Sequence, residues 1–120
     1  MRYQQADVDA MLPLQIAEFH VLLALSADDR HGYGIIHDVE SRTGGALRMS
    51  PGTLYRTVQR LVEERMIEEL RRPSGPRIDP RRRYYRITDF GRAVVTAEAQ
   101  RLSELVRLAR GVLRERPQPS

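Results

Sequence analysis

The sequence predicts a mainly α-helical fold with one small β-hairpin and a long C-terminal helix. Residues 50–67 place apolar side chains at helical spacing, and residues 67–88 hold two strand-like runs around a segment rich in proline. Residues 89–115 keep an apolar heptad pattern. With 120 residues, 41% of them hydrophobic, the chain can build a single core. The two ends, residues 1–11 and 116–120, are expected to be flexible.

The first helix is expected within residues 12–27. Ile16, Phe19 and Leu23 lie on one apolar stripe, which neighbouring leucines and valines widen. Two aspartates then end the helix. A stripe of this width implies packing contacts on two sides of the helix.

A second helix follows from residue 31, with Ile35 and Val39 as core positions and a pair of glycines as its stop. Gly32 and Gly34 weaken the first turn of a helix. We interpret them as positions where the backbone packs closely against a neighbouring helix.

The third helix begins at a well-defined point, because Ser50 supplies an N-cap oxygen and Pro51 suits the first helical position. One face of this helix is apolar, and the opposite face carries hydroxyls and guanidiniums without a carboxylate. The apolar face comprises Leu54, Val58, Leu61 and Val62, and the polar face comprises Thr53, Arg56, Thr57 and Arg60. A polar face of this kind suits an anionic partner, although many such faces are simply solvated.

The hairpin that follows is strongly basic. Because side chains alternate across a strand, Tyr85 and Ile87 are expected to face the core. The opposite face would then hold Arg82, Tyr84 and Arg86. A helix-turn-helix followed directly by a basic hairpin is typical of a winged helix, a DNA-binding module whose recognition helix enters the major groove. We therefore expect a winged-helix DNA-binding domain over residues 12–88.

The charge distribution favours the same function. Residues 1–40 carry two arginines against seven acids, whereas residues 71–92 carry eight arginines against two acids. A polyanion responds to this local positive potential rather than to the net charge of +4. The expected DNA contacts are Ser50, Thr53, Arg56, Thr57 and Arg60 on the recognition helix and Arg81, Arg82, Arg83, Tyr84 and Arg86 on the wing.

The last helix is too long to belong only to a winged helix. Apolar residues recur at alternating spacings of four and three along it, and a helix of about 27 residues would extend ~40 Å. The expected seam is Val95, Ala99, Leu102, Val106, Ala109 and Leu113. Folding back on its own core is the alternative, but the other helices have little spare apolar surface. We therefore expect a homodimer, with Ile16, Phe19 and Leu23 as a second partner surface.

Enzymatic and membrane functions find little support in the sequence. The three histidines are not spaced as a metal triad, and no phosphate loop or nucleophile elbow occurs. His31, His37 and Asp38 offer a weak metal site, and we expect the histidines to cap and pack the second helix instead. No cysteine, signal peptide or membrane span is present, so we expect a cytoplasmic protein without a cofactor.

Three segments resemble the PadR family of bacterial transcriptional regulators. They are HGYGI at residues 31–35, PGTLYRTVQRLVEERMIEE at 51–69 and RRRYYRITDFGR at 81–92. The resemblance covers roughly residues 12–110, and the single C-terminal helix looks like the smaller subfamily. It implies a winged-helix dimer that represses promoters, often of efflux pumps or detoxification enzymes, and is released by small apolar or aromatic compounds.

The resemblance also assigns residues. It implies that Tyr55 is characteristic of the recognition helix and that Tyr84 and Tyr85 mark the wing. Members commonly carry glycine where this chain has Arg65, so the recognition helix is expected to end without a left-handed glycine. The chain also lacks the tryptophan on which multidrug-binding members stack planar ligands.

The sequence thus predicts a ligand-responsive repressor that binds an inverted-repeat operator in double-stranded DNA as a homodimer. The alternative is a winged helix that binds RNA or another protein and has no regulatory ligand. An acidic face on the third helix would favour that alternative, and residues 53–60 carry no acid.

Overall fold

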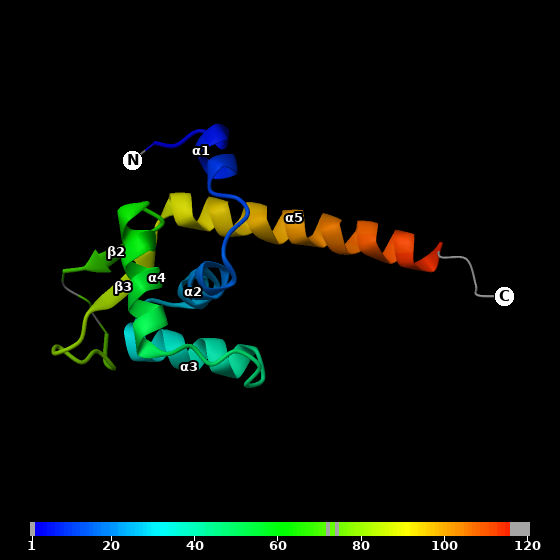
Figure 1. Ribbon diagram of the computed structural model, residues 1–120. Helices are drawn as coiled ribbons and strands as arrows, with labels where there is room; N and C mark the ends of the chain where they lie inside the picture. The colour runs from blue at the N-terminus through cyan, green and yellow to red at the C-terminus, as the bar shows by residue number, and fades with distance from the viewer. Residues whose placement is uncertain (1, 72, 74, 116–120) are drawn as a thin grey trace.

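A computed structural model of the chain describes residues 2–71, 73 and 75–115, and it shows a body of packed helices and a small sheet from which one helix projects (Figure 1). The molecule measures 65 × 35 × 24 Å along its principal axes. The elements are α1 (Gln5–Ala10), α2 (Ile16–Ala27), β1 (Arg30–His31), α3 (Gly32–Arg42), α4 (Pro51–Glu63), β2 (Ile67–Leu70), β3 (Tyr84–Ile87) and α5 (Asp89–Arg114). No helix within the described part of the chain combines the length and the apolar composition that crossing a membrane requires.

The core lies where the apolar faces of α2, α3 and α4 meet the sheet and the first turns of α5. Its fully buried side chains include Val21, Leu22, Leu25, Ile35, Val39, Leu54, Leu61 and Val94. The expected close packing is confirmed at Gly32, where a Cβ atom would lie 3.0 Å from the Tyr55 hydroxyl oxygen and 3.1 Å from Leu54. At Gly34 the nearest atom would be 3.5 Å away, so that glycine has no such tight neighbour.

The sheet has three antiparallel strands in the order β1-β3-β2. The two expected strands, β2 and β3, pair with Ile67 opposite Ile87 and Leu70 opposite Tyr84. The sequence pattern does not predict the third strand, β1. It covers the other edge of β3, with His31 opposite Tyr84, so β3 is the central strand of the sheet.

The end of α4 differs from an ordinary helix terminus. Arg65 adopts a left-handed backbone conformation with a φ of 61°. Glycine adopts this conformation without a steric penalty, whereas a residue with a Cβ atom does not. The helix therefore ends without a glycine, as expected, but Arg65 takes the geometry that a glycine would take.

The long helix α5 begins where expected, and its first three turns belong to the body. Thr88 caps it, with its hydroxyl oxygen accepting the Gly91 N–H at 3.0 Å. Phe90, Val94 and Val95 are buried in the core of the same chain. The assignment of Val95 to a dimer seam is therefore wrong, because the seam's first position lies where α5 still packs on the winged helix.

The expectation of a flexible start at residues 1–11 is also wrong for most of that segment. Residues 5–10 form α1, which packs against α5 with Val8 buried. The Tyr3 ring lies 5.4 Å from the Phe90 ring. These apolar contacts stabilise the segment on the body. The expected flexible tail, residues 116–120, lies outside the described residues.

Candidate nucleic-acid interface

The first two turns of α4 present an exposed polar face without acidic side chains. The Ser50 hydroxyl oxygen accepts the Thr53 N–H at 3.2 Å, so the predicted N-cap is confirmed. Tyr55 and Arg56 are exposed, and Arg56 donates to the Thr53 hydroxyl at 3.3 Å. Among the described residues, no carboxylate lies within ion-pairing distance of Arg56. This guanidinium is held at the helix start and faces solvent.

The predicted division of α4 into an apolar and a polar face is wrong for two residues at the border. Thr57 is only 9% exposed, and its hydroxyl donates to the Thr53 carbonyl at 2.8 Å. It follows Leu54 by three residues and precedes Leu61 by four, so it lies on the edge of the buried face. Val62 shows the opposite error, because it is exposed rather than buried.

Arg60 has a partner that the sequence did not reveal. Its Nε donates to the Glu18 carboxylate of α2 at 2.7 Å. The Glu18 side chain is 5% exposed, whereas that of Arg60 is 57% exposed. The hydrogen bond and the charge of Glu18 raise the pKa of Arg60 further above its ordinary value. A Gln-x-x-Glu spacing before an apolar run, at residues 15–18, is the one sequence signal that pointed to Glu18, because it is typical of a capping box.

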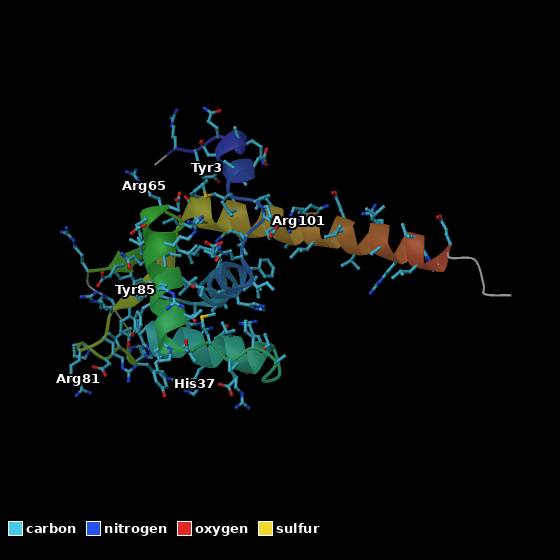
Figure 2. All side chains as sticks on the ribbon, viewed as in Figure 1. Tyr3, His37, Arg65, Arg81, Tyr85 and Arg101 are labelled. Atoms are coloured by element: carbon cyan, nitrogen blue, oxygen red, sulfur yellow. The ribbon has the colours of Figure 1, made fainter. Side chains whose placement is uncertain are left out.

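The wing carries the four expected arginines, all exposed and each beside an acid. The ion pairs are Arg81 with Asp79 at 3.2 Å, Arg82 with Asp79 at 3.5 Å, Arg83 with Glu69 at 3.6 Å and Arg86 with Asp29 at 2.8 Å. Hydrogen bonds from Arg81 lower the pKa of Asp79. Exposed pairs of this kind are weak in water, so the guanidiniums remain available to phosphates. Figure 2 shows Arg81 at the outer edge of the wing, far from α5.

The expected exposed position of Tyr84 is wrong. The residue is 4% exposed, its hydroxyl accepts the Asp79 N–H at 2.9 Å, and its ring lies edge-on to His31 at 5.3 Å. Alternation puts Tyr84 on the face opposite Tyr85, but on that face the His31 ring and the wing loop at Asp79 pack against it. Tyr84 therefore stabilises the fold of the wing rather than presenting a side chain to solvent.

His31 connects the wing to the helices. Its Nδ1 accepts the Gly34 N–H at 3.0 Å, so the expected capping role is confirmed for this histidine. Burial and the nearby Arg82 lower the pKa of His31. The guanidinium carbon of Arg82 also lies 5.7 Å from the centre of the Tyr33 ring. Tyr33 belongs to the first turn of α3, which His31 caps. Because Gly32 in that turn packs on Tyr55, the wing and the exposed face of α4 meet at the start of α3.

A second surface lies on the half of α5 that projects from the body, residues 103–114, which we call the free half. Leu113 is 70% exposed, and Leu105, Val106, Leu108 and Val112 are also exposed. Of the other expected seam residues, Ala99 and Ala109 are exposed and Leu102 is half-buried. On α2, Ile16 is 72% exposed, whereas Phe19 and Leu23 are half-buried against the core. The helix does not fold back on its own chain (Figure 1).

Comparison with known proteins identifies the arrangement. Residues 21–97 match the family described as "Transcriptional regulator PadR-like family". Transcriptional regulator Rv3488 of Mycobacterium tuberculosis (strain ATCC 25618 / H37Rv) is 36% identical over 88 residues, which cover 73% of this chain and 77% of that protein.

Solved structures share the fold. A PadR-like transcriptional regulator from Bacillus cereus has a TM-score of 0.66 at 22% identity, covering 92% of this chain and 99% of that chain. Bacillus subtilis PadR in complex with operator DNA has a TM-score of 0.54 at 19% identity, covering 90% of this chain and 51% of that chain. These likenesses confirm the predicted fold class.

Proposed function

This chain belongs to the PadR-like family of transcriptional regulators, and we propose that it is a sequence-specific DNA-binding repressor that acts as a homodimer. The family membership confirms the expectation of a regulator rather than an enzyme. The observation that carries the proposal is the exposed, acid-free start of α4 next to a wing with four exposed arginines. A cytoplasmic location, with access to the chromosome, follows from this function.

The start of α4 is the proposed reading surface. Ser50 and Thr53 would approach the DNA backbone, while Tyr55, Arg56 and Arg60 would reach base edges or phosphates in the major groove. The buried Thr57 supports this surface from below. Solved PadR from Bacillus subtilis is in complex with operator DNA, which supports the proposal by likeness of fold.

The wing is the proposed phosphate-binding surface. Arg81, Arg82, Arg83 and Arg86 would exchange their exposed carboxylate partners for DNA phosphates, while Tyr84 holds the loop in shape. Such contacts position a protein on DNA without reading its sequence.

The exposed apolar half of α5 is the proposed dimer surface. Five large apolar side chains on this projecting helix are exposed to solvent, and an exposed apolar patch of this kind marks an interaction surface. A second copy of the chain carries the same apolar surface and could bury it in a two-fold interface. A homodimer would bind an inverted-repeat operator, because its two-fold symmetry matches that of the DNA site. A small apolar or aromatic effector, bound between α2 and α5, would release the repressor by changing the separation of the two recognition helices.

Selection of duplexes from a random DNA library, followed by anisotropy titration of the selected and scrambled duplexes, tests the proposal. We expect the selected duplex to bind at least 1000-fold more tightly at physiological salt, as is typical of specific binders. Arg56→Ala should lose about 5- to 150-fold in affinity for the selected duplex. Arg110→Ala, which removes the same charge from the free half of α5, is the matched control. Equal affinity for all duplexes, or preference for RNA, would favour the alternative of an RNA- or protein-binding module.

A further inference from the structure

Glu18 is a buried charge in a helix that otherwise packs by apolar contacts. Removing a carboxylate from water is costly unless hydrogen bonds and an opposite charge compensate. Both compensations are present, because one oxygen accepts the Gln15 N–H at 2.9 Å and the other accepts Arg60 Nε at 2.7 Å. The carboxylate therefore has a fixed position relative to the backbone of α2.

The turn that carries Gln15 is itself fixed. The preceding amide, Leu14 N–H, donates to the Glu98 carboxylate of α5 at 2.8 Å. Glu98 is buried and paired with Arg101, and the hydrogen bond from Arg101 lowers the pKa of Glu98. Figure 2 shows Arg101 on α5, and Glu98 lies one turn earlier along that helix. The backbone N–H groups of Leu14 and Gln15 thus fix the turn before α2, and Glu18 lies in the first turn of that helix.

This geometry orders the Arg60 side chain. A guanidinium has five N–H donors in a planar fork, and Glu18 uses the one on Nε. Within the described part of the chain, the only hydrogen bond shown for the Arg60 guanidinium is the one from Nε, so its two terminal nitrogens bond no described residue. An exposed arginine loses rotamer freedom when it binds, and a side chain that is already ordered loses less.

We propose that Glu18 is a positioning residue of the DNA interface, which orients Arg60 so that its terminal nitrogens face the DNA. The inference rests on the proposed function of α4 as a recognition helix. Glu18 itself does not touch DNA. If Glu18 instead only joined α2 to α4 and stabilised the fold, its replacement would lower stability without a specific loss of affinity for the selected duplex.

The test compares Glu18→Gln, Arg60→Ala and the double variant on the selected and scrambled duplexes, with urea unfolding of each protein. Glutamine keeps the size and one acceptor oxygen but loses the charge. We expect Glu18→Gln to weaken selected-duplex binding about 10-fold and to leave scrambled-duplex binding unchanged or stronger. In the Arg60→Ala background, Glu18→Gln should no longer weaken binding to the selected duplex.

Glu63→Gln is the matched control, because it removes an exposed carboxylate from α4 itself. Loss of a negative charge near DNA should strengthen binding through long-range electrostatics. Glu18→Gln is expected to act in the opposite direction on the selected duplex. If both variants strengthen binding, or if the effects of Glu18→Gln and Arg60→Ala are additive, the inference is overturned.

Arg60→Lys keeps the proposal testable if Glu18→Gln does not fold, because position 60 is exposed. Lysine retains the charge, but its N–H donors share one nitrogen, so it cannot hold Glu18 through one nitrogen and present two others to the DNA in a planar fork. We expect it to bind the selected duplex more weakly than wild type, and wild-type affinity would overturn the inference. Failure of wild-type protein to discriminate any duplex would instead refute the proposed function.

Discussion

Gly91 marks a contact between backbone segments at the start of α5. A Cβ atom at this position would lie 2.0 Å from the Met66 carbonyl oxygen, which already accepts a hydrogen bond from the Thr88 hydroxyl at 3.0 Å. Backbone on both sides cannot yield as a flexible side chain would. We expect Gly91→Ala to lower the free energy of unfolding by about 3 kcal/mol or more. Urea unfolding followed by circular dichroism measures the decrease.

Gly111, in the same helix, provides the control for Gly91. A Cβ atom there would meet nothing within 4 Å. Because alanine is the better helix former, Gly111→Ala should raise the free energy of unfolding by up to about 1 kcal/mol. Equal effects of the two substitutions would show that the Met66 contact does not govern position 91.

Arg65 tests the cost of a left-handed residue at a helix end. Its N–H bonds the Val62 carbonyl at 3.0 Å and the Met66 N–H bonds the Leu61 carbonyl at 2.9 Å, which is the hydrogen-bond pattern of a Schellman motif. Replacing Arg65 by glycine or by alanine removes the same side-chain contacts, but only glycine relieves the backbone. We expect the glycine variant to be more stable than the alanine variant by about 1 kcal/mol in thermal unfolding. Equal stability would refute the strain.

At the scale of elements, the start of α3 depends on a neutral histidine. His31 Nδ1 accepts the Gly34 N–H only when that nitrogen is unprotonated, and the pKa of His31 is lowered from 6.5. Between the folded pKa and 6.5, the unfolded chain binds more protons, so stability rises with pH in that window. The contribution is complete above pH 6.5 and is lost as pH falls through the folded pKa. Asparagine caps helices without titrating. Urea midpoints should therefore fall more between pH 7.5 and pH 5 for wild type than for His31→Asn.

The wing should contribute salt-dependent affinity without specificity. Removing one phosphate-binding guanidinium should reduce the slope of log affinity against log salt by about 0.9. Arg81→Ala and Arg83→Ala should each weaken selected and scrambled duplexes alike, whereas Arg110→Ala should leave the slope unchanged. Weakening of the selected duplex alone would mean that the wing reads sequence.

Most elements could be predicted because their patterns are local. The spacing of apolar residues located α2, α4 and α5, and Ser50 with Pro51 marked the start of α4. The strand β1 has only two residues, too few to show any alternation. Tyr84 was misplaced because alternation assigns a residue to a face but does not say what covers that face.

The interface was harder to predict because its key contacts join distant residues. The exposed position of Arg56 could be predicted from the apolar periodicity of its own helix alone. The partner of Arg60 lies 42 residues away, and no periodicity connects two helices that pack only in the folded chain. Val95 fitted the heptad seam, but the pattern continues across the point where α5 leaves the body.

At the scale of the whole molecule, the body and the free half of α5 carry different proposed surfaces. The body places α4 and the wing around the start of α3, whereas the projecting helix offers apolar surface that no other described segment of the chain covers (Figure 1). The contacts of Leu14 and Gln15 with Glu98 and Glu18 link the start of α2 to the buried part of α5, from which the free half continues. A shift of α5 would therefore reach the recognition helix through one turn of backbone.

The dimer is tested best far from the body, at Leu113. This side chain is 70% exposed and lies on the proposed seam, so Leu113→Asp should leave the winged helix folded while it places an unpaired carboxylate in the dimer interface. A buried unpaired charge costs several kcal/mol, so we expect monomers in sedimentation at micromolar concentration. Arg107→Asp is the control, because Arg107 is exposed on the same half of α5 but is neither a seam position nor one of the exposed apolar side chains. In the dimer, the recognition helices should contact half-sites about 34 Å apart, so only the Leu113 variant should lose cooperative binding to an inverted repeat. A wild-type monomer that binds one half-site at full affinity would contradict the dimer.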